Sequence, residues 1–134
     1  MAISEAVRRF LAEPRFAVLA TINADGLPQQ TVIWYDLEGD EIVMNTARGR
    51  LKDGNLLRDP RVSLCFEDGY RFVTITGTAR LIDDQAVAQE DIRRIAVRYH
   101  GAEKGNQMAE QQFQRQRRVT IRVPVERVIA YGLV

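Results

Sequence analysis

The stretch EIVMNTARGRLKDGNLLRDPRVSLCF, residues 41–66, contains a strand, a short helix and a second strand in immediate succession. Residues 41–46 are mostly apolar and predict the first strand, and residues 61–68 predict the second. Between them, residues 50–58 predict a helix that ends before Asp59-Pro60. One short helix therefore interrupts a run of strands, and the other segments can be assigned outward from it.

Strands dominate on both sides of this stretch, because apolar runs alternate with turn signals such as Asp25-Gly26. Strands are expected at residues 16–22, 29–37, 41–46, 61–68, 71–82 and within 117–134. Helices are expected at residues 4–13, 50–58, about 83–99 and 108–116, with a polar loop at 100–107. Six strands with short turns predict a mainly β fold, a small antiparallel barrel with a few helices.

Two residues inside predicted strands indicate irregular backbone. Gly77 predicts a bulge or a close approach of another chain segment, and Pro124 predicts an edge position or a bulge.

Length and composition narrow the class of protein. The 134 residues correspond to one domain, residues 1–134, and the net charge of +1 argues against a general attraction to nucleic acid or to an anionic membrane. No apolar run approaches the roughly 20 residues of a membrane span, so a cytoplasmic location is expected. Cys65 and His100 are each the single residue of their type, and we expect no metal site.

Three cations, Arg48, Arg50 and Lys52, occupy alternate positions at the junction of strand and helix. Cations are disfavoured at a helix N-terminus, where the helix dipole is already positive. The free backbone N–H groups of that turn, together with Gly49, would suit a bound anion, and Asn55 could add a neutral hydrogen bond. The junction therefore indicates a phosphate or carboxylate site, with a solvated charged surface as the alternative.

The whole sequence resembles the split β-barrel family of flavin and deazaflavin oxidoreductases, which is related to pyridoxamine 5′-phosphate oxidase. The most distinctive part is the basic junction followed by Lys-x-x-Asn-Leu-x-x-Asp-Pro-Arg-Val at residues 52–62. The segments VTITGTARLIDD, residues 73–84, and RRVTIRVPVERVIAYG, residues 117–132, also carry the resemblance. It implies a six-stranded antiparallel split β-barrel and a homodimer with two cofactor sites at the interface.

The resemblance also implies roles for individual residues. The cofactor phosphate would be held by Arg48, Arg50 and Lys52. The segment from Thr31 to Trp34 would lie against the ring system, largely through backbone groups, and Asn45 and Thr46 would bond ring or ribityl oxygens. The full set of expected cofactor residues is Gln30, Thr31, Val32, Ile33, Trp34, Asn45, Thr46, Arg48, Gly49, Arg50, Lys52 and Asn55. Gln29 and the Tyr131-Gly132 end are expected at the periphery.

Coenzyme F420, a deazaflavin with an acidic tail, is the expected cofactor, and FMN is the alternative. The short chain and the segments around residues 48–64 and 77–84 resemble the deazaflavin branch, which implies hydride transfer to a small conjugated acceptor. A polyanionic tail needs additional cations, which Arg58 and Arg61 could supply. A carrier that holds the cofactor without turnover is the rival hypothesis, because fold alone does not settle function.

Several other residues allow two interpretations. Trp34 is interpreted as core or interface, with a ligand platform as the alternative. Arg115, Arg117 and Arg118 are interpreted as a solvated patch, with tail binding as the alternative. His100 is interpreted as a surface histidine that could contact substrate, and no catalytic acid or base is identified.

Overall fold

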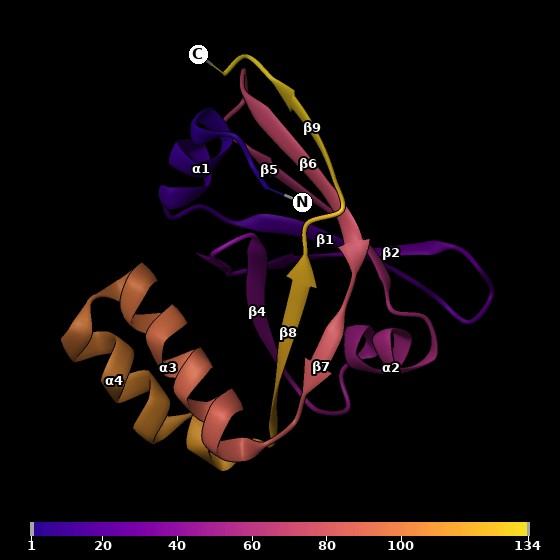
Figure 1. The fold of residues 1–134 in the computed structure, drawn as a ribbon. Helices are drawn as coiled ribbons and strands as arrows, with labels where there is room; N and C mark the ends of the chain where they lie inside the picture. Colours follow the sequence, from indigo (N-terminus) through magenta and orange to yellow (C-terminus); the bar gives the residue numbers. More distant parts are fainter. Residues whose placement is uncertain (1, 134) are drawn as a thin grey trace.

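The computed structural model describes residues 2–133, which form two antiparallel sheets and a pair of helices outside them (Figure 1). The strands are β1 (Ala17–Ile22), β2 (Pro28–Ile33), β3 (Asp36–Glu38), β4 (Glu41–Ala47), β5 (Arg61–Glu67), β6 (Phe72–Thr78), β7 (Arg80–Ile82), β8 (Arg118–Pro124) and β9 (Arg127–Tyr131). The helices are α1 (Glu5–Ala12), α2 (Leu51–Arg58), α3 (Gln85–His100) and α4 (Ala102–Gln111), and a 3₁₀ turn, η1, follows at Phe113–Arg115.

The two sheets enclose the main hydrophobic core. One sheet has the strand order β2-β1-β5-β6-β9, and the other has the order β3-β4-β8-β7. Alternate residues of each strand point inward, as Leu19, Leu64 and Ile75 do from three neighbouring strands of the first sheet. Met44 and Ile121 meet them from the second sheet. This burial of apolar side chains between sheets is the main stabilising term of the fold.

The helices α3 and α4 pack against the outer face of the smaller sheet (Figure 1). A second buried cluster forms there, in which Val43 of β4 contacts Ile92, Ile95, Ala109 and Phe113. The outer face of the sheet is thus covered by apolar helix residues, and the polar residues of β4 and β8 on that face are buried with them.

The mainly β antiparallel architecture is confirmed, but the expected six-stranded barrel is not what the described residues show. Residues 2–133 form nine strands in two separate sheets. Among these residues, no strand pairing joins the edge strands β2 and β9 of one sheet to the edge strands β3 and β7 of the other, so the barrel is not closed. Three predicted strands are each divided. Residues 29–37 divide at Trp34-Tyr35, residues 71–82 divide at Ala79, and the last strand divides after Pro124.

The division at Pro124 has a local cause. Proline has no backbone N–H to donate, and the next two N–H groups bond to separate places, the β3–β4 turn beside the smaller sheet and strand β6 of the larger sheet. Val125 donates to the Asp40 carbonyl oxygen at 3.0 Å, whereas Glu126 donates to the Thr76 carbonyl oxygen at 3.1 Å. The chain therefore leaves one sheet and enters the other within two residues, which apolar periodicity cannot reveal.

The close backbone approach predicted at Gly77 is confirmed. A Cβ atom added to Gly77 would lie 2.6 Å from the Pro124 carbonyl oxygen and 2.8 Å from a Val123 methyl group. The glycine thus allows β6 to pass directly beside the bend of the last strand pair.

The predicted loop at residues 100–107 is wrong, because α4 already begins at Ala102. Gly101 has a φ of 88° and reverses the chain between α3 and α4. Gly105 then packs on the backbone of Val97, where an added Cβ would lie 2.6 Å from the Val97 Cα atom. The segment is polar because most of its residues face water, and the helix is stabilised by its contact with α3.

The outer face of the larger sheet is partly open to solvent. Val18, Cys65 and Thr74 lie opposite one another in register, with Val32 and Ile129 at the two ends of the same row. Val32 is 61% exposed and Ile129 is 50% exposed. None of the helices of the described residues is long and apolar enough to cross a membrane.

Candidate functional site

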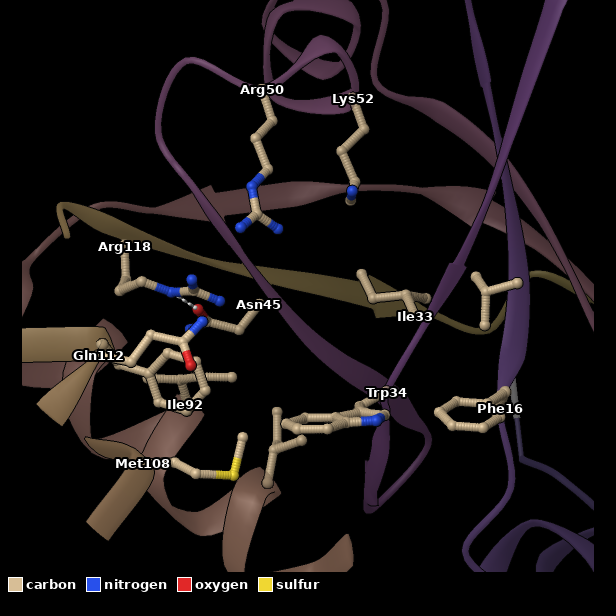
Figure 2. A pocket seen from close by; sticks show the side chains of 13 residues that line it. Phe16, Ile33, Trp34, Asn45, Arg50, Lys52, Ile92, Met108, Gln112 and Arg118 are labelled. Carbon is tan, nitrogen blue, oxygen red and sulfur yellow. Dashed lines mark hydrogen bonds between the residues drawn. The ribbon is translucent and has the colours of Figure 1, made fainter. Parts of the chain in front are cut away.

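A pocket of about 230 Å³ lies where the ends of β2 and β4, the start of α2 and the α3–α4 hairpin come together (Figure 2). It is lined by Phe16, Val32, Ile33, Trp34, Asn45, Arg50, Lys52, Ile92, Ile95, Met108, Gln112, Phe113 and Arg118. One side of this set is cationic and the other is apolar and aromatic. The two sides define what kind of ligand the pocket suits.

The cationic side is formed by Arg50, Lys52 and Arg118. Arg50 is the N-cap residue of α2 and makes no side-chain capping bond, so its side chain is free to extend into the pocket (Figure 2). Lys52 lies on the first turn of the same helix and points the same way. Within residues 2–133, no carboxylate forms an ion pair with any of these three cations. The pocket therefore presents three positive charges that the chain itself leaves unneutralised.

The three charges influence one another. Burial lowers the pKa of the Lys52 ammonium, and the neighbouring Arg50 and Arg118 lower it further. Burial also lowers the pKa of the Arg118 guanidinium to about 10, with an added contribution from Arg50. Crowded like charges that have lost solvent are stabilised when an anion binds among them. The electrostatics of the pocket accordingly favour an anion over a neutral or cationic group.

Arg118 is the buried member of the set, with 4% of its surface exposed. Its Nε donates to the Asn45 side-chain oxygen at 2.9 Å, and one terminal nitrogen donates to the Gln116 side-chain oxygen at 2.7 Å. The guanidinium also lies over the Phe113 ring, 4.9 Å from its centre. Both acceptors are neutral, so its charge remains available to a ligand. The prediction that Arg118 belongs to a solvated patch is wrong.

Arg48, the first cation of the junction, does not line the pocket. One of its terminal nitrogens donates to Asp53 at 2.8 Å and the other donates to Asp83 at 3.1 Å. Asp53 is 2% exposed, and it also accepts the Gly49 backbone N–H at 2.8 Å. Arg48 thus neutralises a buried carboxylate. The three alternating cations divide into one that stabilises the junction and two that face the pocket.

The apolar side combines a strand end with the helical hairpin. Trp34 is stacked on Tyr99 with ring centres 5.2 Å apart, and Tyr99 is stacked on Phe16 at 6.2 Å. Ile92 and Met108 face the same space from α3 and α4 (Figure 2). A flat aromatic surface beside flexible aliphatic groups suits a planar conjugated ligand. The structure places Trp34 half-buried in the pocket wall, packed against the second hydrophobic cluster.

Two tyrosines near the pocket are already engaged. The Tyr35 hydroxyl is buried and donates to the Leu11 carbonyl oxygen at 2.9 Å, and burial raises its pKa to about 12. The Tyr99 hydroxyl donates to the Arg15 carbonyl oxygen at 2.6 Å, and burial raises the pKa of this group as well. Neither hydroxyl is suited to give a proton to a ligand.

Of the twelve residues expected at a cofactor, six line the pocket. These six are Val32, Ile33, Trp34, Asn45, Arg50 and Lys52. The other six, Gln30, Thr31, Thr46, Arg48, Gly49 and Asn55, lie outside its lining.

The reasons differ among the residues outside the lining. Asn55 is buried, and its amide nitrogen donates to Thr21 and Asn23 at 3.0 Å each, which fixes α2 to the end of β1. Thr46 is buried with its hydroxyl unpaired inside the protein. Gln30 is exposed on β2. Arg61 is also exposed and is engaged by its near neighbour Asp59 at 2.7 Å.

Sequence reasoning missed six of the remaining lining residues, which are Phe16, Ile92, Ile95, Met108, Gln112 and Phe113. The seventh, Arg118, was considered only as a contact to an acidic tail. The three- and four-residue spacing of Ile92, Ile95 and Ala96 does predict an apolar helix face. It does not identify what that face packs against. Only the docking of α3 and α4 on β4 and β8 brings these residues to the basic junction.

The fold and the pocket together define a two-sheet β protein with a pocket beside a strand-to-helix junction, cationic on one side and aromatic on the other. The family model of pyridoxamine 5′-phosphate oxidase matches residues 3–132 of this chain. The chain therefore belongs to the pyridoxamine 5′-phosphate oxidase family.

A curated relative and two solved structures illustrate the range of this family's fold. The pyridoxine/pyridoxamine 5′-phosphate oxidase of Kineococcus radiotolerans is 31% identical over 110 residues, which cover 81% of this chain and 48% of the relative. The chain thus spans about half the length of this curated relative. A conserved hypothetical protein of Mycobacterium tuberculosis is 31% identical, with a TM-score of 0.79 over 98% of this chain and 86% of that one.

A structure described as an F420 reductase shares the fold closely. It has a TM-score of 0.77 and 23% identity, and the match covers 95% of this chain and 98% of that chain. At this identity the likeness is one of fold. The two chains nevertheless have nearly the same extent.

Proposed function

We propose that this protein is a coenzyme F420-dependent oxidoreductase that transfers hydride between the deazaflavin and a small conjugated acceptor. The observation that carries the proposal is the pocket. On one side of it Arg50, Lys52 and Arg118 have no acidic partner among residues 2–133, and on the other side lies Trp34. FMN is the alternative cofactor, since it too combines a phosphate with a planar ring system.

The residues of the pocket fit such a group. Arg50 and Lys52, with the free N–H groups of the first turn of α2, would hold the phosphate. Ile33 and Trp34, at the end of β2, would lie against the ring system. A bound deazaflavin or flavin supplies hydride transfer, and the chain's part is to bind and orient the ring and to exclude water.

Two observations favour F420 over FMN. The F420 reductase described above matches this chain over nearly its whole length. In addition, Arg115 and Arg117 are exposed on the segment that leads to Arg118, where they could meet an acidic tail. FMN carries no such tail, so with FMN bound Arg115 would stay in solvent and Arg117 would keep its ion pair with Asp83 at 3.5 Å.

A homodimer belongs to the same proposal. The pocket of one chain, about 230 Å³, is below the ~300–1,000 Å³ usual for small-molecule sites. Two lining residues, Phe16 and Val32, are each 61% exposed, and Val32 lies on the open face of the larger sheet. A second copy packed on that face would cover both residues and deepen the pocket.

The first test is a fluorescence titration of the protein with F420 and, in parallel, with FMN. We expect saturable binding of F420 and weaker binding of FMN. The double variant Arg50→Ala/Lys52→Ala is expected to weaken binding by about 1–3 kcal/mol for each charged hydrogen bond lost. Lys104→Ala, an exposed lysine on α4 outside the lining, is the control and should bind like the wild type.

Arg48→Ala separates the two roles of the basic junction. Because Arg48 is bonded to the buried Asp53, we expect this variant to unfold at lower urea concentration and to keep most of its cofactor affinity. Unchanged affinity in the Arg50/Lys52 double variant would contradict the proposed phosphate site. Oxidation of reduced F420 by an added quinone or enone distinguishes an enzyme from a carrier, which would bind without turnover.

A further inference from the structure

A chain of buried polar groups leads from α3 through the smaller sheet to the pocket. It begins at Asp91, which is 5% exposed, and passes through Thr120 on β8 and Asn45 on β4 to Arg118. The Thr120 hydroxyl lies 2.7 Å from Asp91, and the Asn45 amide nitrogen lies 3.3 Å from the Thr120 hydroxyl. Figure 2 shows the last bond, between Asn45 and Arg118.

The Asp91 carboxylate fixes which group donates and which accepts in each of these hydrogen bonds. A carboxylate only accepts hydrogen bonds, so the Thr120 hydroxyl must donate its one proton to Asp91. Its oxygen can then only accept, and the group that faces it must be the amide nitrogen of Asn45. The second proton of that nitrogen goes to the Ala88 carbonyl oxygen at 2.9 Å. The oxygen of Asn45 is thereby turned toward Arg118.

This orientation decides how Arg118 presents its charge. With the Asn45 oxygen toward it, the guanidinium is held through Nε, and a flipped amide would instead point N–H groups at a cation. One further N–H is used by Gln116. Three of the five guanidinium protons have no bond recorded within residues 2–133, and they belong to the end of the side chain that lines the pocket.

The charge of Asp91 is compensated on its other side. Its second oxygen accepts a bond from Arg94 at 3.1 Å, and Arg94 also bonds Glu38 at 2.8 Å. Asp91 is therefore a buried carboxylate paired with Arg94 through one oxygen. Its other oxygen accepts the Thr120 hydroxyl proton and so fixes the donors and acceptors of the hydrogen bonds that follow.

We propose that Asp91 and Thr120 are positioning residues that orient Arg118 for binding an oxyanion. This inference rests on the proposed function, in which the pocket takes a phosphate-bearing cofactor. It assigns a role in binding to two residues outside the pocket lining, one on α3 and one on β8.

The test uses inorganic phosphate as the probe and follows the arginine side-chain signals by NMR. In the wild type we expect saturable phosphate binding and slow solvent exchange of the Arg118 Nε–H. Thr120→Val removes the hydroxyl at nearly constant volume and should weaken phosphate binding about tenfold. Thr120→Ser keeps the hydroxyl and should bind within about twofold of the wild type, which a purely steric role of Thr120 would not predict.

The outcomes separate the two proposals. Equal phosphate affinity in Thr120→Val and wild type would overturn the positioning role and leave the proposed function intact. If Thr120→Val does not fold, rapid exchange of the Arg118 Nε–H in the wild type would overturn the positioning role by itself. Absence of saturable phosphate binding in the wild type would overturn both.

Discussion

At the scale of the residue, identical side chains near the pocket have opposite roles because their partners differ. Arg48 is neutralised by Asp53 and Asp83, whereas Arg118 is buried against the neutral oxygens of Asn45 and Gln116. Burying a cation without an acid is costly, and the cost falls when an anion binds. The placement of Arg118 therefore favours the bound state over the free state.

Binding of a simple phosphate monoester should depend on pH through Lys52 and Arg118. Both pKa values are lowered in the free protein, that of Arg118 to about 10, and a bound anion favours the charged forms. Affinity should thus be full below these lowered pKa values and should fall as the pH rises through about 10. Methyl phosphate, a dianion throughout since its second pKa is about 6, can be titrated between about pH 8 and 10.5. A flat profile over this range would contradict the prediction.

At the scale of the element, the α3–α4 hairpin determines the apolar half of the pocket. The hairpin turns at Gly101 and closes on itself at Gly105, which lies against Val97. Met108 and Gln112 reach the pocket only because α4 is held this close to α3 (Figure 2). The sequence predicted a loop at residues 100–107, because a mostly exposed helix carries little apolar periodicity.

Gly105→Ala should separate the two helices. The new Cβ would lie 2.6 Å from two backbone atoms of Val97, and relief of this overlap should cost about 1–3 kcal/mol of unfolding free energy. Urea denaturation measures this loss of unfolding free energy. Cofactor affinity should fall as well, because Met108 and Gln112 would move away from the pocket. Gly54→Ala is the matched control, since a Cβ at Gly54 meets no atom within 4 Å and lies inside α2. The Gly54→Ala variant should be more stable than the wild type by about 0.5–1 kcal/mol. If Gly105→Ala proved as stable as Gly54→Ala, the tight packing of Gly105 against Val97 would be ruled out.

At the scale of the whole molecule, the outer faces of the two sheets differ in what covers them. The smaller sheet is covered by α3 and α4 (Figure 1). The larger sheet has a partly open outer face that reaches the pocket at Val32. The proposed dimer places this face against its copy. The shared pocket would then be completed by the same contact that buries the face.

Ile129→Asp should weaken this dimer while leaving the folded chain intact. Ile129 is 50% exposed and lies in register with Thr74 on the open face, so the charge would be placed inside the proposed interface. Loss of a buried isoleucine, about 1.5–3 kcal/mol, corresponds to a roughly ten- to hundredfold weaker dimer. Sedimentation velocity at a series of protein concentrations measures it. Val87→Asp, on the exposed surface of α3, should sediment like the wild type. A monomeric wild type would refute the dimer.

The mainly β character, the helix between the strands at residues 41–46 and 61–68, and the basic junction could all be predicted from the sequence. It also determined the membership in the pyridoxamine 5′-phosphate oxidase family. These are local properties, since turn residues, apolar runs and adjacent cations act over a few neighbouring positions. Of the six expected cofactor residues that line the pocket, Asn45, Arg50 and Lys52 flank this one junction, whereas Val32, Ile33 and Trp34 were expected from the family resemblance.

Contacts between distant parts of the chain set which cations remain unpaired within residues 2–133 and which residues form the other wall of the pocket. Arg48 and Asp83 are 35 residues apart, and Arg118 and Asn45 are 73 residues apart, so no local pattern links them. The division of three predicted strands between two sheets likewise depends on which distant carbonyl oxygen each backbone N–H meets. Pairing and burial of charges are set by contacts between elements, and these contacts bring a basic stretch of sequence to one side of a pocket.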